Sequence, residues 1–194
     1  MSGSLTRREL LVAAGAATAA LAGCTGGGGT GGGNGGAGDG EPDGGVTEPG
    51  ESRPAWQTTT FTDATTDETF AIEGFDSPVV LHTFGTWCST CKRQQGNIAT
   101  LADRRDDISF VDLTIDENDN PGKVASHAES NGFGWHFGVA SADLTRSLVD
   151  DFGQSVTVAP RSPVIVVCPD GAAYKVGKVV SADTIESTVD SNCG

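Results

Sequence analysis

The chain has 194 residues, of which 26 are acidic and 12 basic, and its formal net charge is −14. Phosphate binding needs a basic surface, so this charge excludes nucleic acid as an expected partner. Half of the 28 glycines lie between Gly26 and Gly50. The remainder, about 140 residues, is enough for one folded domain with a single core.

Residues 1–24 are typical of an export signal. Arg7 and Arg8 precede an apolar stretch at 10–22, which is too short and too rich in alanine for a membrane span. The arginine pair in TRRELL resembles a twin-arginine signal. The sequence LAGC resembles a lipobox, which would make Cys24 the lipidated first residue of the mature chain. The alternative is a plain signal peptide or a retained amino-terminal helix, with Cys24 incidental.

Residues 25–54 form a glycine-rich acidic segment with no hydrophobic period, TGGGGTGGGNGGAGDGEPDGGVTEPGESRP. This composition predicts a disordered linker. A glycine-rich coil of about 30 residues has a root-mean-square reach on the order of 30 Å. We therefore expect a domain of residues 55–194 on a membrane tether. The acidic composition, with only four lysines, resembles that of secreted proteins from extreme halophiles.

The first elements of the domain follow from residue alternation and apolar runs. TTTFTD and ETFAIEG flank a turn of the sequence DATTD, which predicts a hairpin. The apolar run SPVVLHTF at 77–84 is typical of a buried central strand. From Cys88 the apolar positions have a helical period up to Arg105, and ISFVDLTI at 108–115 is the next strand.

The second half of the domain alternates helices and strands. A helix is predicted from Asn120-Pro121, a strand in WHFGVA, and a helix that ends at Gly153. SPVIVVCPDG and AAYKVGKVV form a strand pair around a Pro-Asp-Gly turn, and ADTIESTVDSN is the last helix. The order predicts an α/β fold with a mixed central sheet flanked by helices.

The pair Cys88 and Cys91 is the strongest functional signal. A structural zinc site needs four ligands, and the chain has no second C-x-x-C and no H-x-x-x-H spacing, so we expect no metal. A structural disulfide remains open, because exported chains meet an oxidising compartment. Cys88, however, follows a strand and a short loop at the point where a helix begins. Free backbone N–H groups and the helix dipole stabilise a thiolate there, which favours a reactive thiol.

The segment VVLHTFGTWCSTCK resembles the active-site segment of the thioredoxin superfamily, and within it the TlpA-like membrane-tethered thiol reductases that include cytochrome c maturation enzymes. The likeness extends more weakly over residues 56–194. It implies a thioredoxin-like fold with an amino-terminal hairpin and an inserted strand-helix unit between Ile115 and Phe152. It also implies that Trp87 belongs to the catalytic segment, that Cys88 attacks, and that Cys91 resolves the mixed disulfide.

Two further roles are implied by the same resemblance. Pro163 would be the cis-proline that holds substrate backbone beside the reactive sulfur, with Ser162 supplying backbone contacts, and Pro160 is the rival position. His82, six residues before Cys88, occupies the position of a buried acid that moves the proton of the buried thiol in relatives. A hydrogen-bonded core histidine with no catalytic part is the alternative for His82.

Two further cysteines and one acidic stretch are expected to have structural roles. Cys168 and Cys193 are left over once Cys24 is lipidated and the C-x-x-C pair is formed, which suggests a second disulfide. The acidic stretch at 112–120 lacks an EF-hand pattern, so a solvated turn is expected there rather than a calcium site.

The sequence therefore predicts a monomeric thiol-disulfide oxidoreductase without a cofactor, lipid-anchored on the outer face of the cytoplasmic membrane. Its expected partners are protein thiols or disulfides and a membrane electron donor or acceptor. Two alternatives stay open: a copper carrier like the SCO proteins that uses the two cysteines and a histidine such as His136, and a thioredoxin-fold binding module with a permanent disulfide.

Overall fold

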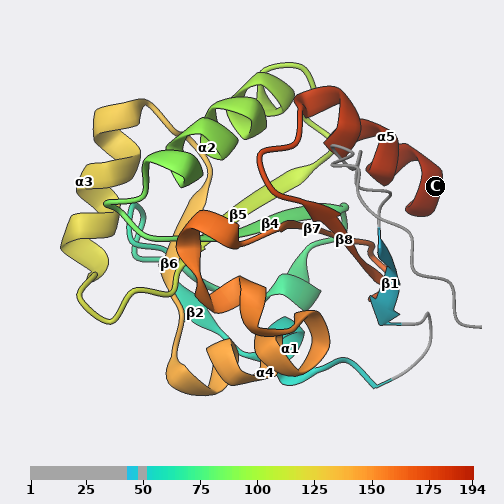
Figure 1. Ribbon diagram of the computed structural model, residues 1–194, viewed down its shortest axis with the longest axis horizontal. Coiled ribbons are helices and arrows are strands. Elements are labelled where there is room, and N and C mark those ends of the chain that lie inside the picture. Colours follow the sequence, from blue (N-terminus) through green and yellow to red (C-terminus); the bar gives the residue numbers. More distant parts are fainter. Residues whose placement is uncertain (1–42, 48–51) are drawn as a thin grey trace, which may run out of the picture. The chain divides into compact units, whose positions relative to one another are not determined.

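The computed structural model describes residues 43–47 and 52–194 (Figure 1). The predicted signal with Arg7, Arg8 and Cys24, and the predicted linker apart from 43–47 and 52–54, lie outside these residues. Within them, every helix is too short or too polar to cross a bilayer.

A mixed sheet of six strands forms the centre of the domain, in the order β1-β8-β7-β4-β5-β6 (Figure 1). Strands β4, β5 and β6 are parallel, whereas β4 with β7, β7 with β8, and β8 with β1 are antiparallel. The central strand β4 is buried at every position, as its apolar run predicts. The bounds are β1 Asp43–Thr47, β4 Val79–Phe84, β5 Ser109–Thr114, β6 His136–Val139, β7 Val164–Val167 and β8 Ala173–Gly177.

Helices cover both faces of the sheet. On one face, Ile98 of α2 (Ser89–Ala102) and Ile185 of α5 (Ala182–Asn192) pack against Val80. The same face carries α3 (Pro121–Asn131), whose Val124 packs beside Phe84. The other face is covered by α4 (Ala142–Phe152) and the short α1 (Ala55–Thr58). Successive residues of β4 therefore face opposite cores, since side chains alternate along a strand.

The predicted fold class is confirmed, including the hairpin and the inserted unit. Strands β2 (Phe61–Thr62) and β3 (Thr69–Phe70) pair antiparallel before the sheet. Between Ile115 and Phe152 the chain forms α3, β6 and α4. Helix α3 begins at the predicted Asn120-Pro121 start, and Asn120 and Ser141 each cap a helix by accepting a hydrogen bond from a backbone N–H of its first turn.

Residues 43–47 fall inside the predicted linker. These residues form β1 and pair with the edge strand β8, with Asp43 opposite Lys175 and Thr47 opposite Ala173. The sequence DGGVT has no apolar alternation, and backbone hydrogen bonds to an exposed edge do not require one. The one-turn helix α1 and the 3-10 turns η1 (Ile72–Gly74), η2 (Gln154–Thr157) and η3 (Ala159–Arg161) were also not predicted.

A disulfide joins Cys168, just after β7, to Cys193 at the end of α5, across a sequence separation of 25. Closing a loop of that length in the unfolded chain contributes about 3.5 kcal/mol in the chain-entropy account.

We expect a Cys168→Ala/Cys193→Ala variant to lose about 3 kcal/mol of unfolding free energy, measured by urea denaturation without reductant. Equal stability of variant and parent would show that the bond contributes nothing.

Candidate redox-active site

The C-x-x-C pair lies where β4 passes into α2. Cys88 is the N-cap of α2, and its sulfur accepts the backbone N–H of Cys91 at 3.1 Å. The two cysteines form a disulfide with their Cα atoms 5.2 Å apart. A thiolate released at Cys88 would be stabilised by that N–H and by the helix dipole, which is the condition for a reactive cysteine. The sequence predicted this placement.

Both sulfur-bearing residues are covered in the disulfide state. Cys88 is 1% exposed and Cys91 is 0% exposed, whereas the adjacent Trp87 is 64% exposed. Reaction at Cys88 therefore requires a displacement of its covering neighbours. Exposure alone does not distinguish the two cysteines, whereas the N-cap position sets Cys88 apart.

The loop before Cys88 is held by carboxylates of the β5–α3 connection. Asp119 accepts the Thr86 backbone N–H at 2.9 Å and the Thr86 hydroxyl at 2.6 Å. The indole N–H of Trp87 donates to Asp116. Hydrogen bonds from the Asn118 backbone and from Trp87 hold the pKa of Asp116 below its usual value. These two aspartates of the predicted acidic turn remain partly exposed and also hold the loop that precedes Cys88.

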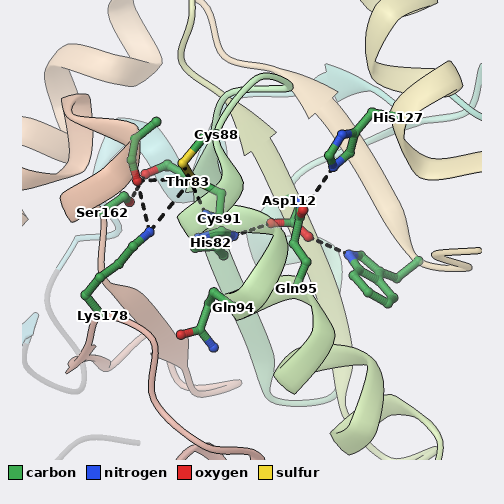
Figure 2. Close-up of polar contacts among 12 residues, drawn as sticks. His82, Thr83, Cys88, Cys91, Gln94, Gln95, Asp112, His127, Ser162 and Lys178 are labelled. Carbon is green, nitrogen blue, oxygen red and sulfur yellow. Dashed lines mark hydrogen bonds and ion pairs between the residues drawn. A yellow bond between two sulfur atoms is a disulfide. The ribbon is translucent and has the colours of Figure 1, made fainter. Parts of the chain in front are cut away.

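A lysine that the sequence did not point to lies against the inner cysteine. Lys178 Nζ is 3.8 Å from Cys91 Sγ and donates to the Ala159 carbonyl oxygen at 2.9 Å (Figure 2). The same carbonyl oxygen lies 3.1 Å from Cys91 Sγ. Burial lowers the pKa of Lys178 to about 8. Lys178 follows Cys91 by 87 positions, and no local pattern of residues marks it.

His82 is part of a buried polar chain beneath α2. Its Nδ1 is 2.6 Å from Asp112 Oδ1, and the indole N–H of Trp135 donates to Asp112 Oδ2 at 2.7 Å (Figure 2). His82 and Asp112 are opposite each other on β4 and β5, and both are 0% exposed. Because a carboxylate only accepts, His82 donates from Nδ1. Its Nε2 atom is buried without a hydrogen-bond partner.

A second buried histidine lies on α3. His127 Nε2 is 2.9 Å from Gln95 Oε1, and the His127 ring lies 5.2 Å from that of Phe84. Burial lowers the pKa of His127, which favours the neutral ring. The sequence offered no reason to select His127 or Gln95.

The structure places Ser162 and Pro163 next to the turn that contacts Cys91. Both are buried and lie between η3 and β7. The Ser162 hydroxyl contacts that of Thr83 (Figure 2). The Thr83 hydroxyl also donates to the Val156 carbonyl oxygen at 2.9 Å. Pro160 lies within η3 and is exposed. The Ser162 hydroxyl is therefore already paired with a buried side chain. The predicted substrate contact at Ser162 would use its backbone groups.

His136 is not brought to the cysteines. Its Nδ1 is 2.8 Å from Asp63 Oδ2, and its ring lies 4.5 Å from that of Phe70. His136 is paired with Val111, whose side chain packs in the α4-facing core, opposite the face that carries α2. Across residues 43–47 and 52–194, no three histidine, cysteine or acidic residues are arranged to hold a metal ion.

The sequence matches no family model and no curated protein, but solved structures resemble the domain. A thioredoxin-family thiol:disulfide interchange protein of Chlorobium tepidum TLS is 18% identical, over 76% of this chain and 99% of that one, with TM-score 0.57. BsSco, of the Sco family of cytochrome c oxidase assembly proteins, is 19% identical over 74% and 95%, with TM-score 0.57.

A secreted Mycobacterium tuberculosis disulfide oxidoreductase homologous to E. coli DsbE is 13% identical, over 68% of this chain and 97% of that one, with TM-score 0.53. These likenesses show that the chain has a thioredoxin-like fold. At such identities they bear on the fold alone, so the chemistry rests on the residues of the site.

The Asp112 carboxylate provides a test of the buried polar chain. The amide introduced by Asp112→Asn offers one acceptor oxygen for two buried donors, so this substitution should cost about 2 to 3 kcal/mol of unfolding free energy, measured in urea. Asp143→Asn, which breaks only the surface pair with Arg146, should change it by less than about 0.5 kcal/mol. If the two variants were equally stable, Asp112 would have no structural role.

Proposed function

We propose that the protein exchanges thiols and disulfides with other proteins through Cys88 and Cys91. The observation that carries this proposal is the position of the disulfide. Cys88 caps α2, and the Cys91 N–H points at its sulfur. A disulfide that served only to staple the chain would need no such donor at one sulfur.

The proposed reaction proceeds in two displacements. The Cys88 thiolate attacks one sulfur of a substrate disulfide, which forms a mixed disulfide and releases the first substrate thiolate. Cys91, one helical turn away, then attacks Cys88 Sγ, which forms the intramolecular disulfide and releases the second substrate thiolate. Two electrons pass from the cysteine pair to the substrate. The reverse sequence oxidises a substrate dithiol.

The proposed location is the outer face of the cytoplasmic membrane, with the domain lipid-anchored at Cys24. The signal-like residues 1–24 support export, and one similar solved structure is described as secreted. A membrane electron donor or acceptor would then reduce or reoxidise Cys88 and Cys91 after each exchange. That partner would determine whether the protein reduces or oxidises its substrates.

A copper-carrying role like that of the SCO proteins is the second candidate, and the likeness to BsSco is the observation that favours it. Copper sites with soft ligands use thiolates together with imidazole. The histidine considered for that role, His136, packs on the far face of the sheet. We therefore place thiol exchange first.

Trapping provides the test of exchange. A reduced Cys91→Ser variant should form a stable mixed disulfide at Cys88 with a disulfide-bonded peptide, detected by intact mass and peptide mapping. The parent protein should instead end in its own Cys88–Cys91 disulfide and release reduced peptide. The control variant, Cys88→Ser, should form no adduct, because Cys91 lies one turn into α2 and lacks the N-cap position that stabilises a thiolate at Cys88.

Two results would count against exchange. The first is a Cys91→Ser protein that forms no adduct although its Cys88 thiol is shown to be reduced. The second is one copper ion held tightly by the reduced parent and lost in Cys88→Ser, which would favour the carrier role.

A further inference from the structure

The end of β8 and the residues after it contain three backbone irregularities, at Val176, Gly177 and Val179. Gly177 is paired with Val164 and Lys175 with Ile165, so Val176 is an extra residue in the ladder. Gly177 has φ 145° and Val179 has φ 53°. A positive φ is a genuine outlier for a β-branched residue and costs of order 1 to 3 kcal/mol. Bulges near the end of a sheet change the direction of the side chains that follow. Lys178 lies between the two residues with positive φ, Gly177 and Val179.

Two side chains of α2 hold this strained segment in place. Gln94, which is 0% exposed, accepts the Val180 backbone N–H at 2.8 Å and donates to the Val180 carbonyl oxygen at 3.2 Å. Asn97 donates to the same carbonyl oxygen at 2.8 Å. The helix that carries Cys91 therefore also fixes the segment that carries Lys178, which sets the position of the amine relative to the sulfur.

The result of this arrangement is a half-buried amine beside a fully buried sulfur (Figure 2). Lys178 Nζ is 3.8 Å from Cys91 Sγ, and one of its N–H groups is taken by the Ala159 carbonyl oxygen. Among residues 43–47 and 52–194, the hydrogen bonds donated to the two sulfurs come from the Cys91 backbone N–H and from Lys178.

We propose that Lys178 is a catalytic residue, whose side-chain amine takes the thiol proton of Cys91 as this cysteine resolves the mixed disulfide, and returns it in the reverse reaction. This proposal rests on the proposed function and adds a proton acceptor to it. It also assigns to Lys178 the task that the resemblance gave to His82.

The neutral Lys178 amine accepts the proton of the Cys91 thiol and becomes an ammonium ion. The Cys91 sulfur forms a bond with Cys88 Sγ, and the bond between Cys88 Sγ and the substrate sulfur breaks. The electron pair leaves on the substrate thiolate. The substrate disulfide is the oxidant, and the ammonium ion then loses its proton to water or to the departing thiolate.

The charges around Lys178 suit this step. Burial lowers its pKa to about 8, with Arg93 of α2 acting in the same direction and Asp112 of β5 in the opposite one. An ordinary thiol has a pKa of about 8.5, so the lowered pKa of Lys178 brings its amine closer to a thiol than that of an ordinary lysine, whose pKa is about 10.4. His82 of β4 is hydrogen-bonded to Asp112 through Nδ1, and its Nε2 has no partner.

Stopped-flow reaction with dithiobis(nitrobenzoate), an aromatic disulfide, separates the two cysteines. The full chain is used in a Cys24→Ser background, reduced at Cys88 and Cys91, with the Cys168–Cys193 bond verified by mass. The first thiolate released reports attack by Cys88. The second reports resolution by Cys91.

Lys178→Met should slow the second release at least about tenfold at pH 7, since each unit of rise in the pKa of Cys91 lowers its thiolate fraction about tenfold. The first release should change less than about twofold. The pH at which the second rate levels off should move upward. Lys178→Arg keeps the charge but cannot accept the proton, so its rate should lie between those of parent and Lys178→Met.

Two variants serve as comparisons. Lys175→Met removes the same charge from β8, three residues before Lys178, and should leave both rates within about twofold of the parent. His82→Gln should leave the pH profile of the second release in place. If Lys178→Met kept the second rate and its pH profile, or if only His82→Gln shifted that profile, Lys178 would not be the acceptor.

The outcomes also separate this proposal from the function on which it rests. A normal first release with an unaltered second release in both Lys178 variants overturns only the role of Lys178. A parent protein that shows no first release, although Cys88 is reduced, overturns thiol exchange itself. If Lys178→Met failed to fold, the pH dependence of the second release would be compared between the parent and Lys178→Arg instead.

Discussion

The hydrogen bond from the Cys91 N–H to the Cys88 sulfur is the interaction around which the site is built. It exists because Cys88 caps α2, and Cys88 caps α2 because β4 ends at Phe84 and a loop of three residues separates them. The aspartates of the β5–α3 connection fix that loop through Thr86 and Trp87. Strand, loop and helix thus present one sulfur to unpaired backbone donors.

The two sulfurs are stabilised by different physical means. Around Cys88 the favourable groups are backbone N–H dipoles, which carry no proton that titrates near neutral pH. Around Cys91 the favourable group is a side-chain amine whose desolvation brings its pKa near that of a thiol. The strain at Val179 and the amide contacts of Gln94 hold that amine in place. This division matches the two proposed displacements, because the first needs a thiolate that is already present, whereas the second needs one formed during the reaction.

The local part of the site could be predicted from the sequence, and the long-range part could not. The apolar run of β4, the C-x-x-C spacing and the helix start are all contained within about 25 consecutive residues and have known periods. The contact of His82 with Asp112 depends on the register of β4 with β5, which the sequence does not state. Lys178 reaches Cys91 through a bulge and a strained turn far along the chain. Strand β1 was missed because edge pairing uses the backbone alone.

The two disulfides of the domain allow a direct test of the central claim, that Cys88 and Cys91 are a redox-active pair. Their reduction potentials can be measured separately, by equilibrating the protein in thiol redox buffers and mapping alkylated cysteines by mass. Exchange proteins lie between about −270 and −120 mV, and structural disulfides lie below about −300 mV. We predict a potential for Cys88–Cys91 within the first range, with Cys168–Cys193 still oxidised there. A Cys88–Cys91 bond that stays oxidised together with Cys168–Cys193 below about −300 mV would contradict the claim.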